Sequence, residues 1–79
     1  MNVVITGANR GIGLALVKQY LAGGHSVYAL CRNSSDALNA TGAEVISGVD
    51  VSVPDSLPQA LASLSDVDID ILINNAGVL

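Results

Sequence analysis

The chain has 79 residues, of which 51% are hydrophobic and 13% are charged, and its net charge at pH 7 is -4. Its three basic residues, Arg10, Lys18 and Arg32, are too few to form the basic stripe that binds a nucleic-acid backbone, so a nucleic-acid partner is disfavoured. The apolar runs are too short to span a membrane, and the single cysteine, Cys31, excludes an internal disulfide and a cysteine-rich metal site. With a strand and no leader pattern at the start, these features predict one small cytoplasmic domain without a metal site.

The hydrophobic pattern alternates between segments typical of strands and segments typical of helices. Continuous apolar runs bounded by turn residues predict strands, and apolar residues spaced three and four apart predict helices. Glycine, proline and small polar residues mark the boundaries. In chain order the predicted elements are strand 3–5, helix 12–22, strand 26–31, helix 37–40, strand 44–47, helix 54–65 and strand 69–73.

Several helix ends carry recognisable signals. The first helix is predicted to end at the Gly23-Gly24 pair, and the polar residues 33–36 offer caps for the short second helix. Ser52 followed by Asp55 predicts a capping box at the start of the third helix, with Asp in place of the usual Glu or Gln.

Strands separated by helices predict a parallel sheet, because parallel strands need a long crossover connection. Right-handed crossovers give the strand order 3-2-1-4. The predicted fold class is therefore a three-layer α/β domain with a four-stranded parallel sheet and helices on both faces. Only the helix that follows Pro54 is expected on the second face, and the fourth strand is expected at an edge.

A glycine-rich turn lies between the first strand and the first helix. Residues 6–13 read TGANRGIG. Such a turn brings backbone N–H groups and the positive end of a helix dipole to one point, where a diphosphate can bind. Gly7 allows the tight turn, Gly11 lets the backbone approach a phosphate, and Gly13 lets helix and strand pack closely. The alternative is a turn that serves only this packing.

The spacing T-G-x-x-x-G-x-G resembles the cofactor loop of the short-chain dehydrogenase/reductase family. Residues 71–77, ILINNAG, resemble the second signature of the same family, so the resemblance spans the whole chain. It implies a Rossmann-like fold, a nicotinamide dinucleotide cofactor, and a reaction that moves hydride between that cofactor and a carbonyl or alcohol substrate. It also implies that the loop residues Gly7, Asn9, Arg10, Gly11 and Ile12 hold the diphosphate.

Two other segments are matched by the resemblance. Asp50 and Val51, after the third strand, resemble the pair whose carboxylate and N–H meet the adenine edge, although an Asp there is more often a turn former. Asn74 and Asn75 resemble the segment that steadies the sheet and borders the cofactor's ribose. We assign the structural role to Asn74 and the ligand contact to Asn75. As isolated residues they would be read as turn formers.

The end of the second strand predicts which nicotinamide cofactor is preferred. Proteins that bind NAD in this way place an acid there for the ribose hydroxyls. This strand ends Cys31-Arg32-Asn33 instead, and the guanidinium of Arg32 can pair with a 2′-phosphate. Arg10 supports the same choice by resemblance, so NADP is predicted over NAD; the alternative is that both arginines are solvated surface charges. The complete predicted cofactor set is Gly7, Asn9, Arg10, Gly11, Ile12, Arg32, Asp50, Val51, Asn75, Ala76 and Gly77.

No catalytic residue is predicted. The resemblance implies a Ser and a Tyr-x-x-x-Lys pair that moves the proton. Here Tyr20 and Tyr28 are followed four places later by Gly24 and Arg32. The resemblance therefore implies a truncated dinucleotide-binding domain over residues 1–79, the N-terminal cofactor-binding half of a family member.

Three hypotheses for function stay open. The first is an NADP(H)-binding half of a short-chain dehydrogenase/reductase that is not catalytic alone. The second is a structural or interaction module that self-associates, as a homodimer or higher oligomer, through the exposed fourth strand or the under-covered sheet face, with little or no cofactor binding. The third is a piece of an ordinary enzyme. The substrate is not predicted, because the resemblance places its pocket outside these residues.

Overall fold

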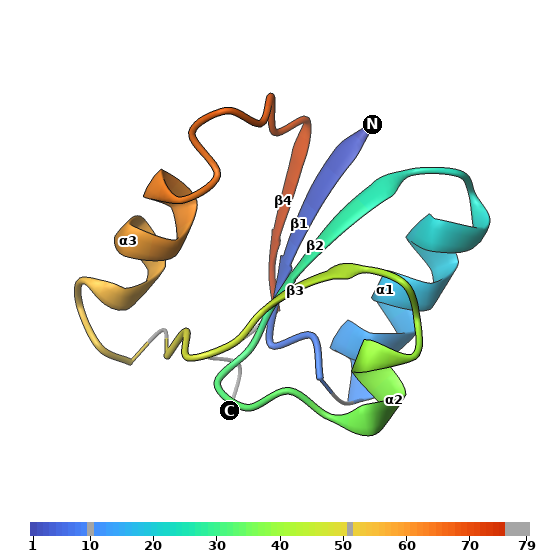
Figure 1. Cartoon of the computed structure of the whole chain (residues 1–79), viewed down its shortest axis with the longest axis horizontal. Helices are drawn as coiled ribbons and strands as arrows, with labels where there is room; N and C mark the ends of the chain where they lie inside the picture. The colour runs from blue at the N-terminus through green and yellow to red at the C-terminus, as the bar shows by residue number, and fades with distance from the viewer. Residues whose placement is uncertain (10, 51, 76–79) are drawn as a thin grey trace.

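The computed structural model describes residues 1–9, 11–50 and 52–75. In these ranges strands and helices alternate along the chain, as predicted (Figure 1). The elements are β1 (Asn2–Thr6), α1 (Gly11–Ala22), β2 (Ser26–Leu30), α2 (Asp36–Asn39), β3 (Glu44–Ile46), α3 (Ser56–Ala62) and β4 (Ile71–Asn74).

The four strands form one parallel sheet in the order β3-β2-β1-β4, which confirms the predicted topology. The strand β1 is central, and Val3, Val4 and Ile5 are fully buried. A strand with neighbours on both sides and helices on both faces has no side that meets water, so a continuous apolar run is favoured there. The strands β3 and β4 form the two edges.

Helices cover both faces of the sheet. In Figure 1, α1 and α2 lie on one side and α3 lies on the other. Because side chains alternate along a strand, Val3 and Ile5 of β1 belong to the core cluster that contains Val17 of α1, and Val4 belongs to the cluster that contains Ala60 of α3. The prediction that only the third helix covers the second face is confirmed.

The third helix begins later than predicted, and its capping box is wrong. The helix starts at Ser56, and the residue at its N-cap, Asp55, makes no side-chain capping bond within the described structure. The Ser52 hydroxyl instead donates to the Asp50 carboxylate at 2.6 Å, and the Ser52 N–H donates to the same oxygen at 3.0 Å. Ser52 therefore closes a turn on Asp50, and the helix starts only after that turn.

The other boundaries that differ from the prediction do so by one to three residues. The short helix α2 begins at Asp36, with Ser35 as its N-cap: the Ser35 hydroxyl accepts from the Leu38 N–H at 3.2 Å. The strand β4 begins at Ile71 rather than at residue 69, because its ladder with β1 starts where Val3 pairs with Ile71.

The longest helix, α1, has 12 residues. No helix within the ranges 1–9, 11–50 and 52–75 has both the length and the hydropathy to cross a membrane. Cys31, directly after β2, is buried against the sheet, and this burial raises the pKa of its thiol. The thiol is therefore a poor nucleophile in the folded chain.

Candidate functional site

The loops that follow the strands meet at the carboxyl edge of the sheet. The glycine-rich loop follows β1, residues 31–35 follow β2, Asp50 follows β3 and Asn75 follows β4. In open parallel sheets, ligands bind outside this edge, where the strand order reverses direction. With the order β3-β2-β1-β4, that reversal lies between β1 and β4. We call these loops together the carboxyl-edge site.

The first turn of α1 fits an anion. Gly11, the first residue of this helix, has φ +57°, a conformation that residues with a side chain rarely adopt; apart from its chain neighbours and its own helix, no atom of the described structure lies within 4 Å of the position that a Cβ would take. The backbone at the positive end of the helix therefore faces open space. Ile12 beside it exposes 74% of its surface. Because the first N–H groups of a helix have no acceptor within the helix, a diphosphate group fits beside the open backbone at Gly11.

Gly13 holds the helix against the turn that follows β1. A Cβ at Gly13 would collide with the carbonyl oxygen of Gly7 and would lie 2.8 Å from the amide nitrogen of Asn75. No side chain fits between α1 and this turn, and Gly13 is itself buried. It is therefore the packing glycine that the motif predicts.

Two asparagines at the end of β4, its last residue Asn74 and the following Asn75, both form hydrogen bonds to the chain around the glycine-rich loop. Asn74 Oδ1 accepts a hydrogen bond from the Thr6 hydroxyl at 2.8 Å. Asn75 Nδ2 donates to the carbonyl of Gly7 at 3.3 Å. Asn74 thus ties β4 to β1, in line with its predicted structural role. The ligand contact of Asn75 stays a prediction, and Ala76 and Gly77 lie outside the described residues.

A second tie joins the glycine-rich loop to the segment after β2. Asn9 Nδ2 donates to the carbonyl of Asn33 at 2.7 Å, and the Ser35 hydroxyl lies 3.3 Å from the carbonyl oxygen of Asn9, to which it donates. The sequence marked Ser35 only as a helix cap. Its link to Asn9 joins residues far apart in the chain, and no local pattern predicts it.

Arg32 and Asp50 lie near each other at the ends of β2 and β3. The shortest distance between the guanidinium and the carboxylate is 3.9 Å, and the Arg32 side chain is 69% exposed. An exposed ion pair of this length adds little stability, so the guanidinium stays available to a ligand. Arg10 and Val51, which the sequence assigned to the same site, lie outside the described residues.

The hydrogen bonds from Ser52 lower the pKa of Asp50. The hydrogen bond from the Ser52 hydroxyl, and then that from its backbone N–H, hold the pKa of the Asp50 carboxyl below its ordinary value; burial opposes them, and the positive charge of Arg32 adds the smallest effect, which also lowers the pKa. The carboxyl is therefore ionised at neutral pH, a state in which it only accepts hydrogen bonds.

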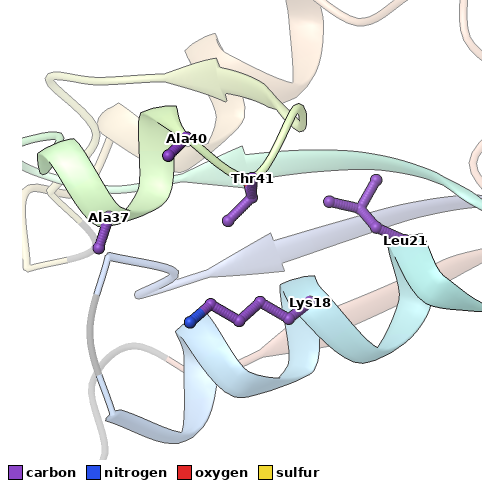
Figure 2. Close-up of a pocket in the computed structure, with 5 residues that line it drawn as sticks. All are labelled: Lys18, Leu21, Ala37, Ala40 and Thr41. Atoms are coloured by element: carbon purple, nitrogen blue, oxygen red, sulfur yellow. The ribbon is translucent and has the colours of Figure 1, made fainter.

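A separate cavity lies between α1 and α2 (Figure 2). Its volume is about 380 Å³, and Lys18 extends along it from α1. The other residues that line it are Leu21, Ala37, Ala40 and Thr41, none of which belongs to the predicted cofactor set. Among the described residues, no group of three or more His, Cys, Asp or Glu side chains is placed to hold a metal ion.

A doubly covered parallel sheet, with a glycine-rich loop that leads into a helix at its carboxyl edge, defines the class of dinucleotide-binding α/β proteins. Within this class, the chain belongs to the short chain dehydrogenase family, whose pattern matches residues 1–79. The resemblance noted in the two sequence motifs is thereby confirmed.

Individual relatives agree with this assignment. The chain is 33% identical over 79 residues to the 3-oxoacyl-(acyl-carrier-protein) reductase MabA of Mycobacterium tuberculosis, and the match covers 98% of this chain and 30% of that protein. It is 37% identical over 82 residues to the serine 3-dehydrogenase of Agrobacterium fabrum, a match that covers 96% and 33%. The chain thus spans about a third of the length of these curated relatives.

Solved structures give the same fold. A 4-hydroxyisoleucine dehydrogenase complexed with NADH matches with a TM-score of 0.83 at 30% identity, over 98% of this chain and 34% of that one. A 3-oxoacyl-(acyl-carrier protein) reductase from Brucella melitensis, in complex with NAD, matches with a TM-score of 0.70 at 30% identity, over 98% and 33%.

We expect Gly13→Ala to lower the free energy of unfolding by about 3 kcal/mol, the upper end for overpacking, because the new methyl group meets a backbone carbonyl. Gly11→Ala is the matched control. Its methyl group enters open space, so only backbone strain of about 1 kcal/mol is expected. Urea unfolding of the three proteins measures both losses, and equal losses would contradict the packing role of Gly13.

The pH dependence of stability tests the Asp50 turn. Because the folded-state pKa of Asp50 is lowered, its contribution is present above the unfolded pKa and is lost as pH falls through the folded value. The difference in unfolding free energy between the parent chain and Asp50→Asn should therefore be constant near neutral pH and shrink in acid. Ser52→Ala should show a smaller acid-dependent change than the parent, and identical pH profiles for the three proteins would argue against the turn.

Proposed function

We propose that residues 1–79 form the cofactor-binding half of a short-chain dehydrogenase and bind NADP(H) in preference to NAD(H). The observation that carries this proposal is Arg32. The segment 31–35 after β2 contains no carboxylate to accept the ribose hydroxyls of NAD, and its one charged side chain is an exposed guanidinium. A guanidinium recognises the 2′-phosphate that distinguishes NADP.

The site residues divide the adenosine end of the cofactor among them. The backbone at Gly11 binds the diphosphate, and the Arg32 guanidinium binds the 2′-phosphate. The Asp50 carboxylate accepts hydrogen bonds from the adenine edge. The open space at Gly11 and the ionised carboxyl of Asp50 support these roles. When bound, the cofactor supplies hydride chemistry, and these residues hold and orient it. The proposed site also contains Gly7, Asn9, Arg10, Ile12, Val51, Asn75, Ala76 and Gly77.

For the whole protein we propose hydride transfer between the nicotinamide and a carbonyl or alcohol substrate. Reductases and dehydrogenases among the relatives support this reaction class. We propose that residues 1–79 alone bind without catalysing, because neither Tyr20 nor Tyr28 is followed by a lysine four places on. The single free, buried cysteine, Cys31, is in keeping with a cytoplasmic location.

Calorimetric titration of the chain with NADPH and with NADH tests the proposal. Saturable binding with tighter affinity for NADPH is expected. Arg32→Ala should weaken NADPH binding by about tenfold to a hundredfold, the range for a charged hydrogen bond, and leave NADH binding within about twofold.

Lys18→Ala is the matched control, since it removes one positive charge from the cavity between α1 and α2. It should leave both affinities unchanged. Equal affinity for the two cofactors in the parent chain, or an equal loss in Arg32→Ala and Lys18→Ala, would refute the preference for NADP. The absence of any binding would refute the binding function itself.

The fourth strand supports a second candidate function, self-association. The strand β4 pairs with β1 on one side only, and within the described sheet its other side carries no strand. Leu72 exposes 48% of its surface, although its partner in the register, Val4, is fully buried on the same face. An apolar edge strand with free backbone groups favours pairing with another chain. We propose a second copy of the chain as the partner, in a two-fold homodimer.

Sedimentation equilibrium without cofactor tests this candidate. The parent chain should sediment as a dimer, and Leu72→Lys should shift it toward monomer by about tenfold or more in the dissociation constant, because a charge would be buried in the contact. Val53→Lys, which changes an equally exposed apolar residue before α3, should keep the dimer. A monomeric parent chain, or the same shift in both variants, would exclude pairing through β4.

A further inference from the structure

Asn9 joins two loops that the proposed function assigns to different parts of the cofactor. It lies in the glycine-rich loop after β1, and its Nδ2 donates to the carbonyl of Asn33, in the segment after β2, at 2.7 Å. The Asn9 backbone carbonyl accepts in return from the Ser35 hydroxyl at 3.3 Å. Because a carbonyl can only accept, the amide nitrogen of Asn9 must be the atom that faces Asn33.

These contacts hold the backbone around Arg32. The Arg32 carbonyl accepts from the Gly48 N–H at 3.0 Å, and the next carbonyl, that of Asn33, accepts from Asn9. Leu30, two residues before Arg32, is also bonded to the glycine-rich loop, because its carbonyl accepts from the Ala8 N–H at 3.2 Å. Arg32 thus projects from a stretch fixed to the β3 end on one side and to the glycine-rich loop on the other.

We propose that Asn9 is a positioning residue for cofactor selectivity, an inference that rests on the proposed function. By bonding the carbonyl of Asn33, it sets the distance between the loop that receives the diphosphate and the guanidinium that receives the 2′-phosphate. A ligand with both phosphates depends on that distance. NADH, which lacks the 2′-phosphate, does not.

The test is a double-mutant cycle on the 79-residue chain, with calorimetric titration by NADPH and NADH. Asn9→Ala should weaken NADPH binding about fivefold, the size of one net hydrogen bond, and change NADH binding by less than about twofold. In the Arg32→Ala background, Asn9→Ala should have no further effect on the ratio of the two affinities, because the group that Asn9 positions is already gone.

Two further variants keep the test sharp. Asn33→Ala leaves the backbone carbonyl in place and should preserve the ratio of the parent chain. Asn9→Leu keeps a side chain of similar size without the N–H donor, and it should reproduce the effect of Asn9→Ala. It replaces Asn9→Ala in the test if the alanine variant does not fold. Amide NMR shifts at residues 33–35 report whether the tie is broken before cofactor is added.

The outcomes distinguish a failure of the positioning role of Asn9 from a failure of the proposed NADP(H)-binding function. An equal loss of NADPH and NADH affinity that persists in the Arg32→Ala background would show direct contact of Asn9 with the diphosphate and overturn the inference. An unchanged ratio in both Asn9 variants would also overturn it, and in both cases the proposed function stands. Absence of binding by the parent chain, or insensitivity of its selectivity to Arg32→Ala, would overturn the proposed function and the inference together.

Discussion

The close approach of α1 to the turn after β1 is the constraint on which the rest of the structure depends. It exists because Gly13 has no side chain, so the helix can lie against the carbonyl of Gly7. The same carbonyl accepts from the amide of Asn75, which follows β4. The Gly7 carbonyl, in the turn after β1, therefore meets both the helix at Gly13 and the residue that follows β4.

This arrangement makes the carboxyl edge of the sheet a suitable place for a ligand. The helix is held with its first turn at the sheet edge, and the unobstructed backbone at Gly11 faces outward. The partial positive charge of the helix end and its unpaired N–H groups are thus presented at one point. The two loops beside it are held by side chains, through Asn9 on one side and through Asn75 on the other.

Charge in the site is arranged by short-range contacts rather than by net charge. The chain carries a net charge of -4, yet an exposed guanidinium, that of Arg32, lies at the end of β2. Asp50 nearby is held by two hydrogen bonds from Ser52. Asp50 neutralises Arg32 only weakly, because their charged groups approach no closer than 3.9 Å and the guanidinium is exposed. The cation therefore remains exposed to a ligand from solvent.

The errors in the sequence prediction have a common physical origin. Ser52 and Asp55 match a capping box, but the hydroxyl and N–H of Ser52 both donate to Asp50, in a turn that ends before the helix begins at Ser56. The pattern of β4 begins at Ile69, but the strand begins at Ile71, where its register with β1 begins. In both cases a contact that the local pattern does not contain decided where the element begins.

The sequence by itself determined the order of strands and helices, the parallel sheet and the family. Apolar periodicity and glycine spacing are local patterns that can be read from the sequence without knowledge of the fold. It also marked Arg32, by the absence of an acid at that strand end. Only the tertiary structure decided that Asn9 reaches Asn33 and that Asn75 reaches Gly7. These contacts join residues distant in the chain, and they form only once the parallel strands bring their carboxyl ends to one edge.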